Sequence, residues 1–174
     1  QLATLEQETI DALDEFLPPH WSHGNPVDVL GDARPKRFVR AIQEVDLDKQ
    51  VDAILVIVTP QAMTNPTGVA KAVARIAPDV KKPILAAWLG GPSMAEGISL
   101  LNKAGVATFD TPEQAVQAFM TLMKYNRNLD ALYETPKAVP IKFEKPRKRL
   151  RESYAPVLSG PGTTISEDIA KRFL

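Results

Sequence analysis

The segment from Thr59 to Gly68 holds the residues of this sequence that are best suited to bind an anion. It follows a strongly apolar run and carries Thr64, Asn65 and Pro66, which are typical of the first turn of a helix. The first N–H groups of a helix have no partner inside it and lie at the positive end of its dipole, so a phosphate can bind there without a lysine. Ordinary capping by Thr64 or Asn65 explains the pattern equally well. The contacts expected of a phosphate site are Thr59, Gln61, Thr64, Asn65, Thr67 and Gly68.

Short loops of small and polar residues follow the other predicted strands. A glycine pair such as Gly90-Gly91 allows a backbone to approach a ligand closely, although a turn with positive φ explains it as well. Neither a G-x-x-x-x-G-K-[ST] nor a G-x-G-x-x-G motif is present. The further contacts expected at this edge are Asn25, Asp28, Gly31, Asp32, Gly90 and Gly91.

Two histidines, His20 and His23, flank Trp21-Ser22 in a predicted loop. This spacing could place two imidazoles on one metal ion or supply a general base. Histidine needs an orienting partner for either role, and no acidic or cysteine residue lies close by in the sequence. We therefore favour an anchoring role in the loop, and we predict no metal site and no catalytic residue in this chain.

The composition excludes several classes of function. Lysine and arginine total 21, which balances 21 aspartate and glutamate residues, so no net charge attracts a nucleic acid. Cysteine is absent, which excludes thiol chemistry and fits a cytoplasmic protein. No apolar run reaches the ~20 residues of a membrane helix. The first residues, beginning with Gln1, resemble neither a start site nor a signal peptide, so we expect a piece of a longer protein.

Strand and helix patterns alternate along the first 125 residues. Continuous apolar, β-branched runs such as Ala53 to Val58 are typical of strands covered on both faces, which occur in parallel sheets. The order predicts an α/β fold: an open parallel sheet with helices on both faces in three layers. Ligands in such folds bind at the carboxyl ends of the strands. The predicted strands are 27–30, 53–58, 83–89 and 106–109; the helices span 2–17, begin near Pro35 and near Thr64, and follow capping boxes at 93–96 and 111–114.

From about Asp130 the helical periodicity ends and prolines become frequent. The basic run Lys145 to Arg149 has no aromatic residues for stacking on bases, so a solvated linker is favoured over a phosphate contact. We predict a linker over 133–162, followed by a helix that opens another region over 163–174.

Several segments between residues 18 and 125 resemble the nucleoside-diphosphate-forming acyl-CoA synthetases, relatives of succinyl-CoA ligase. These segments are His20 to Ala33, Thr59-Pro60-Gln61, Pro83-Ile84-Leu85, Leu89-Gly90-Gly91 and Thr111 to Val116. The resemblance is to the second flavodoxin-like domain of those enzymes. It implies that 1–17 leads in from a preceding domain, that 18–132 is the flavodoxin-like domain, and that 163–174 starts an ATP-grasp region.

The family forms acyl-CoA from a carboxylate, CoA and ATP, or runs the reverse reaction, through an acyl phosphate and a phosphohistidine. The resemblance implies that the histidine, CoA, the nucleotide and magnesium belong to other domains of the polypeptide, so that the isolated chain is inactive and binds no cofactor. The helix opening at Thr64 to Gly68 is then the one that stabilises the phosphohistidine. A homo-oligomer is compatible with this assignment.

Asn25 to Asp32 and Tyr133 to Pro136 also resemble bacterial protein lysine acetyltransferases that carry a fused synthetase-like region. This alternative implies an acetyl-CoA-sensing or scaffold domain without catalysis. An inter-domain packing module is the third alternative.

Overall fold

The computed structural model describes residues 1–133 together with 148, 151, 152, 154, 155, 159, 167 and 171. The chain divides into two compact units, Gln1–Ala131 and Leu132–Leu174, and the first contains the sheet. The predicted helix over 163–174 and nearly all of the predicted linker over 133–162 lie outside the described residues.

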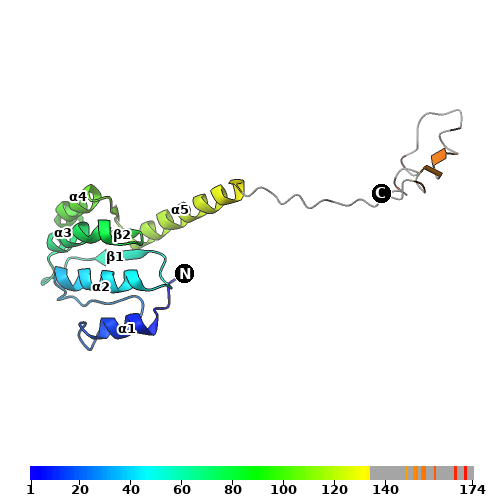
Figure 1. Ribbon diagram of the computed structural model, residues 1–174. Helices are drawn as coiled ribbons and strands as arrows, with labels where there is room; N and C mark the ends of the chain where they lie inside the picture. The colour runs from blue at the N-terminus through cyan, green and yellow to red at the C-terminus, as the bar shows by residue number, and fades with distance from the viewer. Residues whose placement is uncertain are drawn as a thin grey trace. The chain divides into compact units, whose positions relative to one another are not determined.

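Three parallel strands form the sheet, in the order β1-β2-β3. Figure 1 labels the first two of them, with α2 and α3 beside them. They are β1 (Ile54–Val58), β2 (Ile84–Trp88) and β3 (Ala107–Phe109). Ile54 lies opposite Ile84, and Leu85 lies opposite Ala107. The apolar, β-branched runs at 53–58, 83–89 and 106–109 thus formed the parallel strands that the sequence predicted.

Helices cover both faces of this sheet. On one face α2 packs on α3 and α3 on α4, while α1 packs on α2. On the other face Ala115, Val116 and Phe119 of α5 border a small cavity beside Leu55 and Leu85. The α/β architecture is therefore confirmed. The helices are α1 (Gln7–Asp14), α2 (Pro35–Leu47), α3 (Pro66–Ile76), α4 (Ala95–Lys103) and α5 (Pro112–Tyr133), with 3-10 turns at Ala77–Asp79 and Gly91–Met94.

Most of the buried side chains lie between the sheet and the α2–α3–α4 layer. Along β1, Ile54, Val56 and Val58 are buried, whereas Ile57 on the opposite face is 46% exposed. The face under α3 is thus densely packed, and the face on the side of α5 is partly open. The largest fully buried apolar side chains are Trp88, Leu13, Met94, Leu101, Val69 and Val73.

The strand predicted at 27–30 is wrong, because this segment pairs with no strand of the described residues. The backbone N–H of Asp28 donates to Ser22 Oγ at 3.0 Å, and the N–H of Leu30 donates to Asp28 Oδ1 at 2.8 Å. Leu30 also has a φ of 67°. Side-chain acceptors compete here with the strand ladder, and the positive φ ends the extended backbone.

Two further local predictions also need correction. The helix predicted from residue 2 begins only at Gln7, because Glu6 is extended and its N–H donates to Asp48 Oδ2 at 2.9 Å. The capping box predicted at 93–96 does not form: Ser93 Oγ donates to the Gly90 carbonyl, and α4 begins at Ala95 without a side-chain cap. The box at 111–114 forms in part, since the Gln114 N–H donates to Thr111 Oγ1.

Candidate functional site

The amino end of α3 lies directly after β1, at the carboxyl edge of the sheet. Asn65 is the cap, and its Oδ1 accepts from the Gly68 N–H at 2.8 Å. Pro66 has no N–H to offer, and the Val69 N–H is bonded to the Asn65 carbonyl at 2.9 Å. Within residues 1–133, this leaves the N–H of Thr67 as the donor of the first turn for which no partner is described.

Gly31 contacts the loop that leads into α3, although it lies far away in the sequence. Thr64 Oγ1 donates to the Gly31 carbonyl at 2.9 Å, across 33 residues. The Gln61 side chain lies against the same glycine, because a Cβ at residue 31 would stand 2.0 Å from Gln61 Oε1. The fold therefore brings together Gly31, Gln61 and Thr64, as expected for the carboxyl edge of one parallel sheet.

Glu96 is a neighbour of this site that the sequence did not predict. Thr67 Oγ1 donates to Glu96 Oε2 at 3.4 Å, so the first turns of α3 and α4 meet. The exposed Glu96 carboxylate places negative charge beside the helix end and disfavours an anion there. The sequence pattern placed Glu96 in a capping box instead. Its position in the first turn of the next helix was the one sequence feature that could have indicated a place at this edge.

The glycine pair after β2 has two different roles. Gly90 has a φ of 140°, and a Cβ there would stand 2.7 Å from Pro60 Cγ. Gly91 has a φ of 64°, and nothing lies within 4 Å of a Cβ at that position. Gly90 thus lets β2 end against the loop after β1, whereas Gly91 only makes a turn.

We therefore expect Gly90→Ala to lower the free energy of unfolding by about 2–3 kcal/mol. Alanine disfavours the φ of this residue, and its Cβ would clash with Pro60. Gly91→Ala is the matched control, with an expected loss of about 1 kcal/mol from φ alone. Urea titrations of both variants measure the difference. Equal losses would show that the contact with Pro60 relaxes without cost.

The remaining predicted edge residues hold local structure. Asn25 Nδ2 donates to the Ala3 carbonyl at 2.9 Å, away from the α3 end, and Asp28 accepts from Leu30 as described above. Asp32 Oδ1 accepts from Arg37 Nη1 at 2.6 Å, and this hydrogen bond holds the pKa of the Asp32 carboxyl below its ordinary value. Thr59 is exposed at the start of the loop after β1.

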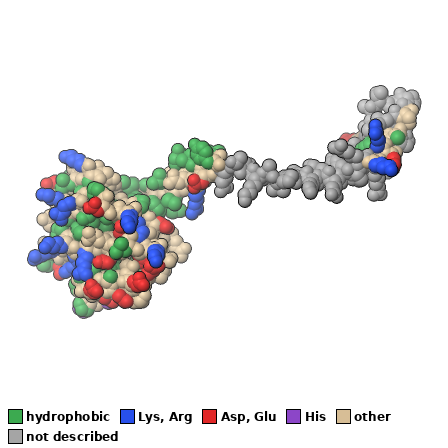
Figure 2. Space-filling model, viewed as in Figure 1, with side chains coloured by type: hydrophobic (Ala, Val, Ile, Leu, Met, Phe, Trp, Pro, Cys, Tyr) green, Lys and Arg blue, Asp and Glu red, His purple; other side chains and the backbone are tan. Residues whose placement is uncertain are grey.

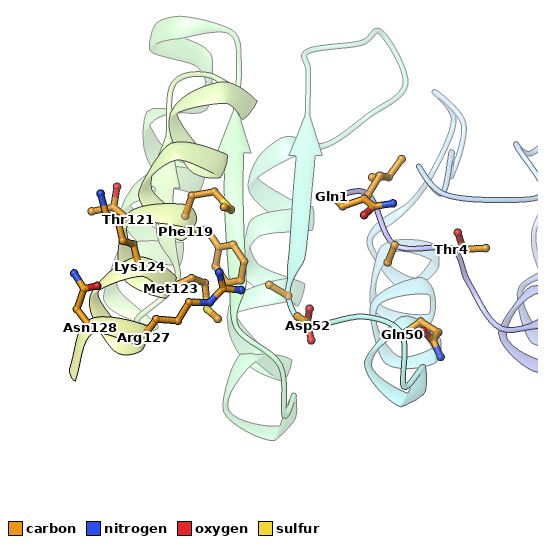
Figure 3. A pocket seen from close by; sticks show the side chains of 14 residues that line it. Gln1, Thr4, Gln50, Asp52, Phe119, Thr121, Met123, Lys124, Arg127 and Asn128 are labelled. Carbon is orange, nitrogen blue, oxygen red and sulfur yellow. The ribbon is translucent and has the colours of Figure 1, made fainter. Parts of the chain in front are cut away.

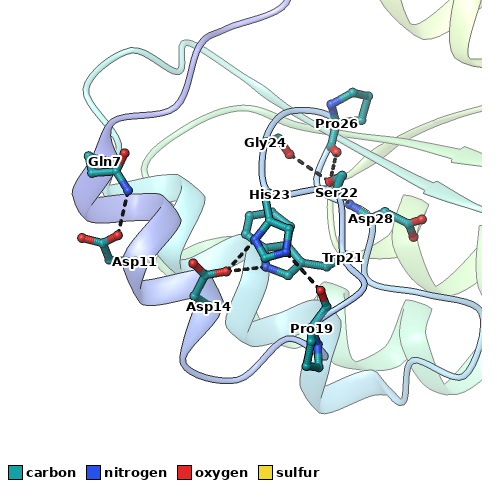
Figure 4. Close-up of polar contacts among 10 residues, drawn as sticks. All are labelled: Gln7, Asp11, Asp14, Pro19, Trp21, Ser22, His23, Gly24, Pro26 and Asp28. Atoms are coloured by element: carbon teal, nitrogen blue, oxygen red, sulfur yellow. Dashed lines mark hydrogen bonds and ion pairs between the residues drawn. The ribbon is translucent and has the colours of Figure 1, made fainter.

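His23 anchors its loop, as the sequence favoured (Figure 4). Its Nδ1 lies 2.9 Å from Asp14 Oδ1, its Nε2 lies 3.1 Å from the Pro19 carbonyl, and its ring lies 4.9 Å from that of Trp21. Trp21 Nε1 donates to the same Asp14 oxygen at 2.6 Å. Asp14 is the orienting partner that the sequence did not reveal, because it lies on α1. His20 is exposed in this loop.

A cavity of about 860 Å³ lies away from the α3 end (Figure 3). Gln1 and Gln50 border one side, and Phe119 and Arg127 of α5 border the other, near the amino end of β1. Within the described part of the chain, no cluster of three or more histidine, aspartate or glutamate residues could hold a metal ion. Nor does any helix there have the length and apolarity to cross a membrane.

Comparison with known proteins places these features in a family. An ADP-forming acetate–CoA ligase I from Archaeoglobus fulgidus is 34% identical over 175 residues, covering 95% of this chain and 24% of that protein. An ADP-forming acetate–CoA ligase from Methanocaldococcus jannaschii is 34% identical over 183 residues, covering 100% of this chain and 25% of that protein. The chain thus spans about a quarter of the length of these curated relatives.

Solved structures agree with this assignment. The apo form of acetyl-coenzyme A synthetase 1 from Ca. Korarchaeum cryptofilum, described as dinucleotide forming, superposes with a TM-score of 0.65 at 32% identity, over 72% of this chain and 28% of that one. The same enzyme in complex with phosphate and ADP gives a TM-score of 0.65 at 32% identity, over 72% and 27%. The sequence profile of the Ligase-CoA domain matches residues 1–133. The chain therefore belongs to the Ligase-CoA domain family of nucleoside-diphosphate-forming acyl-CoA synthetases.

Proposed function

We propose that this chain is one domain of an ADP-forming acetyl-CoA synthetase, in which the amino end of α3 holds a phosphoryl group carried by a histidine of another domain. The observation that supports this most is the Thr67 N–H, which has no described partner at the carboxyl edge of the sheet. Gly31, Gln61 and Thr64 border the same place.

The role of α3 in this proposal is electrostatic. The Thr67 N–H and the positive end of the helix dipole are already oriented before the phosphoryl group arrives, so they stabilise its charge without reorganising. The Asn65 cap fixes the first turn by holding the Gly68 N–H. Glu96 limits how tightly an anion binds, because its carboxylate reduces the positive potential at the helix end. This favours a phosphoryl group that binds and then leaves over an anion that stays bound.

The other reactants belong, in this proposal, to the rest of a longer polypeptide. CoA, the nucleotide and magnesium are bound by CoA-binding and ATP-grasp domains that the 174 residues do not include. Residues 133–162 then connect the two parts, and 163–174 begin the ATP-grasp region. A cytoplasmic location is part of the same proposal. The relatives described above are named as ligases, which favours the enzyme over the acetyl-CoA sensor.

The 174-residue chain alone should form no acetyl-CoA from acetate, CoA and ATP above a protein-free control, because α3 only supports a histidine that the chain does not supply. The full-length protein should convert the same mixture to acetyl-CoA and ADP. Coupled assays of ADP release and thioester formation measure both. Thioester formation by the chain alone, or none by the full-length protein with any short carboxylate, would overturn the proposal.

A further inference from the structure

One edge of β1 has no partner among residues 1–133. In a parallel ladder, alternate residues direct their N–H and C=O groups toward one neighbour. The Ile54 N–H donates to the Pro83 carbonyl at 2.9 Å, and the Val58 carbonyl accepts from the Leu89 N–H at 2.9 Å. Leu55 and Ile57 therefore direct their backbone groups away from β2, to an edge where no described strand pairs with them.

A groove of about 560 Å³ lies along this open edge. Residues 25–29 form one wall and Ile54 to Ile57 form the other, while apolar side chains of α2 form the floor. No backbone hydrogen bond joins these two walls in the described residues. The segment that the sequence predicted as a strand is thus separated from β1 by space along its length.

The adjacent face of the sheet is open as well. Ile57 is 46% exposed, and on α5 the side chains of Val116 and Met120 are 52% and 53% exposed. Hydrophobic side chains gather along α5 in the space-filling view (Figure 2). The cavity of about 860 Å³ continues between α5 and residues 1–4. Buried parallel sheets carry helices on both faces, so this face lacks part of its cover.

We propose that a β-strand from the longer polypeptide occupies the groove between residues 25–29 and β1, parallel to β1, and that the helix after it covers Leu55 and Ile57 beside α5. The strand would pair with the backbone groups of Leu55 and Ile57 on one side and with residues 25–29 on the other. An edge that exposes such groups is otherwise a template for unwanted pairing.

The handedness of β-α-β connections gives a second reason to place the helix after the inserted strand on the face beside α5. This reason does not depend on the cavities. From residues 25–29 the chain moves across the sheet in one direction, through α2 to β1, α3 to β2 and α4 to β3, with these helices on one face. A connection from the groove back to residues 25–29 moves in the opposite direction. Because such connections are right-handed, it must pass over the other face, where residues 1–4 and α5 border the open cavity.

A segment of the same polypeptide fits the groove better than a second copy of this chain does. Residues 25–29 flank the open edge, so the occupant must be a single strand that enters between two walls. The edge strand of another folded copy would contact residues 25–29 before it could reach β1, so it could not enter the groove. Relatives about four times as long as this chain have ample sequence outside the aligned region to provide such a strand.

This inference rests on the sheet and remains if the phosphoryl role of α3 fails. The inserted strand would end between Gly31 and Thr59, where the direction of the strand order reverses. Ligands of open α/β sheets bind at this switch point. The loop after the strand would therefore face the amino end of α3, and the candidate site would be completed from outside these 174 residues.

Cysteine labelling tests the proposal, because the chain has no cysteine of its own. Ile57→Cys is introduced into the 174-residue chain and into a cysteine-free full-length protein, and the rate of maleimide reaction is measured. We expect rapid labelling in the chain alone and labelling at least 100-fold slower in the full-length protein. Leu47→Cys, at a side chain 69% exposed on α2, is the control and should change less than threefold.

Amide exchange distinguishes a strand from any other cover. The N–H groups of Leu55 and Ile57 should exchange quickly in the chain alone and slowly in the full-length protein, while those of Ile54 and Val56 stay protected in both. Equal labelling of Ile57→Cys in the two proteins would overturn the proposal, as would slow labelling without amide protection. Protection that rises with concentration in the chain alone would assign the groove to a second copy and also overturn it.

Discussion

Replacing Asp48 with alanine should lower the free energy of unfolding of this chain by about 2–4 kcal/mol, because it removes the shared acceptor of two backbone N–H groups. The Asp48 side chain is 1% exposed. Its carboxylate accepts from the Glu6 N–H at 2.9 Å and from the Gln50 N–H at 2.8 Å. The variant leaves these part-buried donors without their acceptor and releases the N-terminal segment from the end of α2.

The same carboxylate should make stability depend on pH. Burial raises the pKa of Asp48, but the hydrogen bonds from the backbone of Gln50 and Glu6 outweigh it, so the pKa falls below its ordinary value of 3.8. A depressed folded-state pKa contributes stability that is fully present above the unfolded pKa. That contribution is lost as pH falls through 3.8 toward the folded value.

Urea unfolding at pH 7 and at intervals down to pH 3 measures both effects. Asp48→Asn keeps the shape of the side chain but removes the charge, so the pH dependence below 5 should become shallower than in the unmodified chain. Asp52→Asn is the matched control, because Asp52 is exposed and should change stability by less than about 0.5 kcal/mol. A loss below 1 kcal/mol for Asp48→Ala would show that water replaces the carboxylate.

The regular elements could be predicted wherever one local signal dominated. The run from Ile54 to Val58 could only be a buried strand, and Asn65-Pro66 could only open a helix. The segment from Val27 to Leu30 is mostly apolar too, but no strand of the described residues pairs with it and the Ser22 hydroxyl accepts from the N–H of Asp28. A competing acceptor outside the segment is invisible to a pattern that considers the segment alone.

The contacts of the candidate site likewise include some that the sequence predicts and others that depend on tertiary packing. The loops containing Gly31 and Thr64 meet, as the prediction of one shared sheet edge implied, although residues 27–30 form no strand among the described residues. The contacts of Glu96 with Thr67 and of Asp14 with His23 could not be predicted, because each depends on how two helices or a helix and a loop pack together. Asp48 was missed for the same reason, since Glu6 lies 42 residues away.

In the full-length protein, Thr67→Asp should slow phosphorylation of the histidine by about 100- to 1000-fold. Thr67 provides the first-turn N–H without a described partner, so a carboxylate at this residue adds a fixed negative charge close to the proposed anion, on the side where Thr67 Oγ1 contacts Glu96. The variant keeps this backbone N–H, but repulsion from the added charge at low local dielectric should offset at least the contribution of one preorganised donor, which is typically this large. Thr67→Asn is the matched control, because it has nearly the same shape without the charge, and it should react within about threefold of the unmodified protein.

Folding should respond much less than chemistry to this change. An acidic side chain in the first turn of a helix interacts favourably with the dipole, typically by about 0.3–1 kcal/mol, although Glu96 nearby offsets part of that gain. Thr67→Asp should therefore unfold at nearly the same temperature as the unmodified protein while its phosphorylation is strongly slowed. Gly68→Asp separates these effects less well, since a Cβ there would stand 3.0 Å from Asn65 Cγ and disturb the cap. Rapid-quench measurement of phosphohistidine beside thermal unfolding gives both numbers, and a folded Thr67→Asp protein that phosphorylates at the unmodified rate would leave α3 as a packing element only.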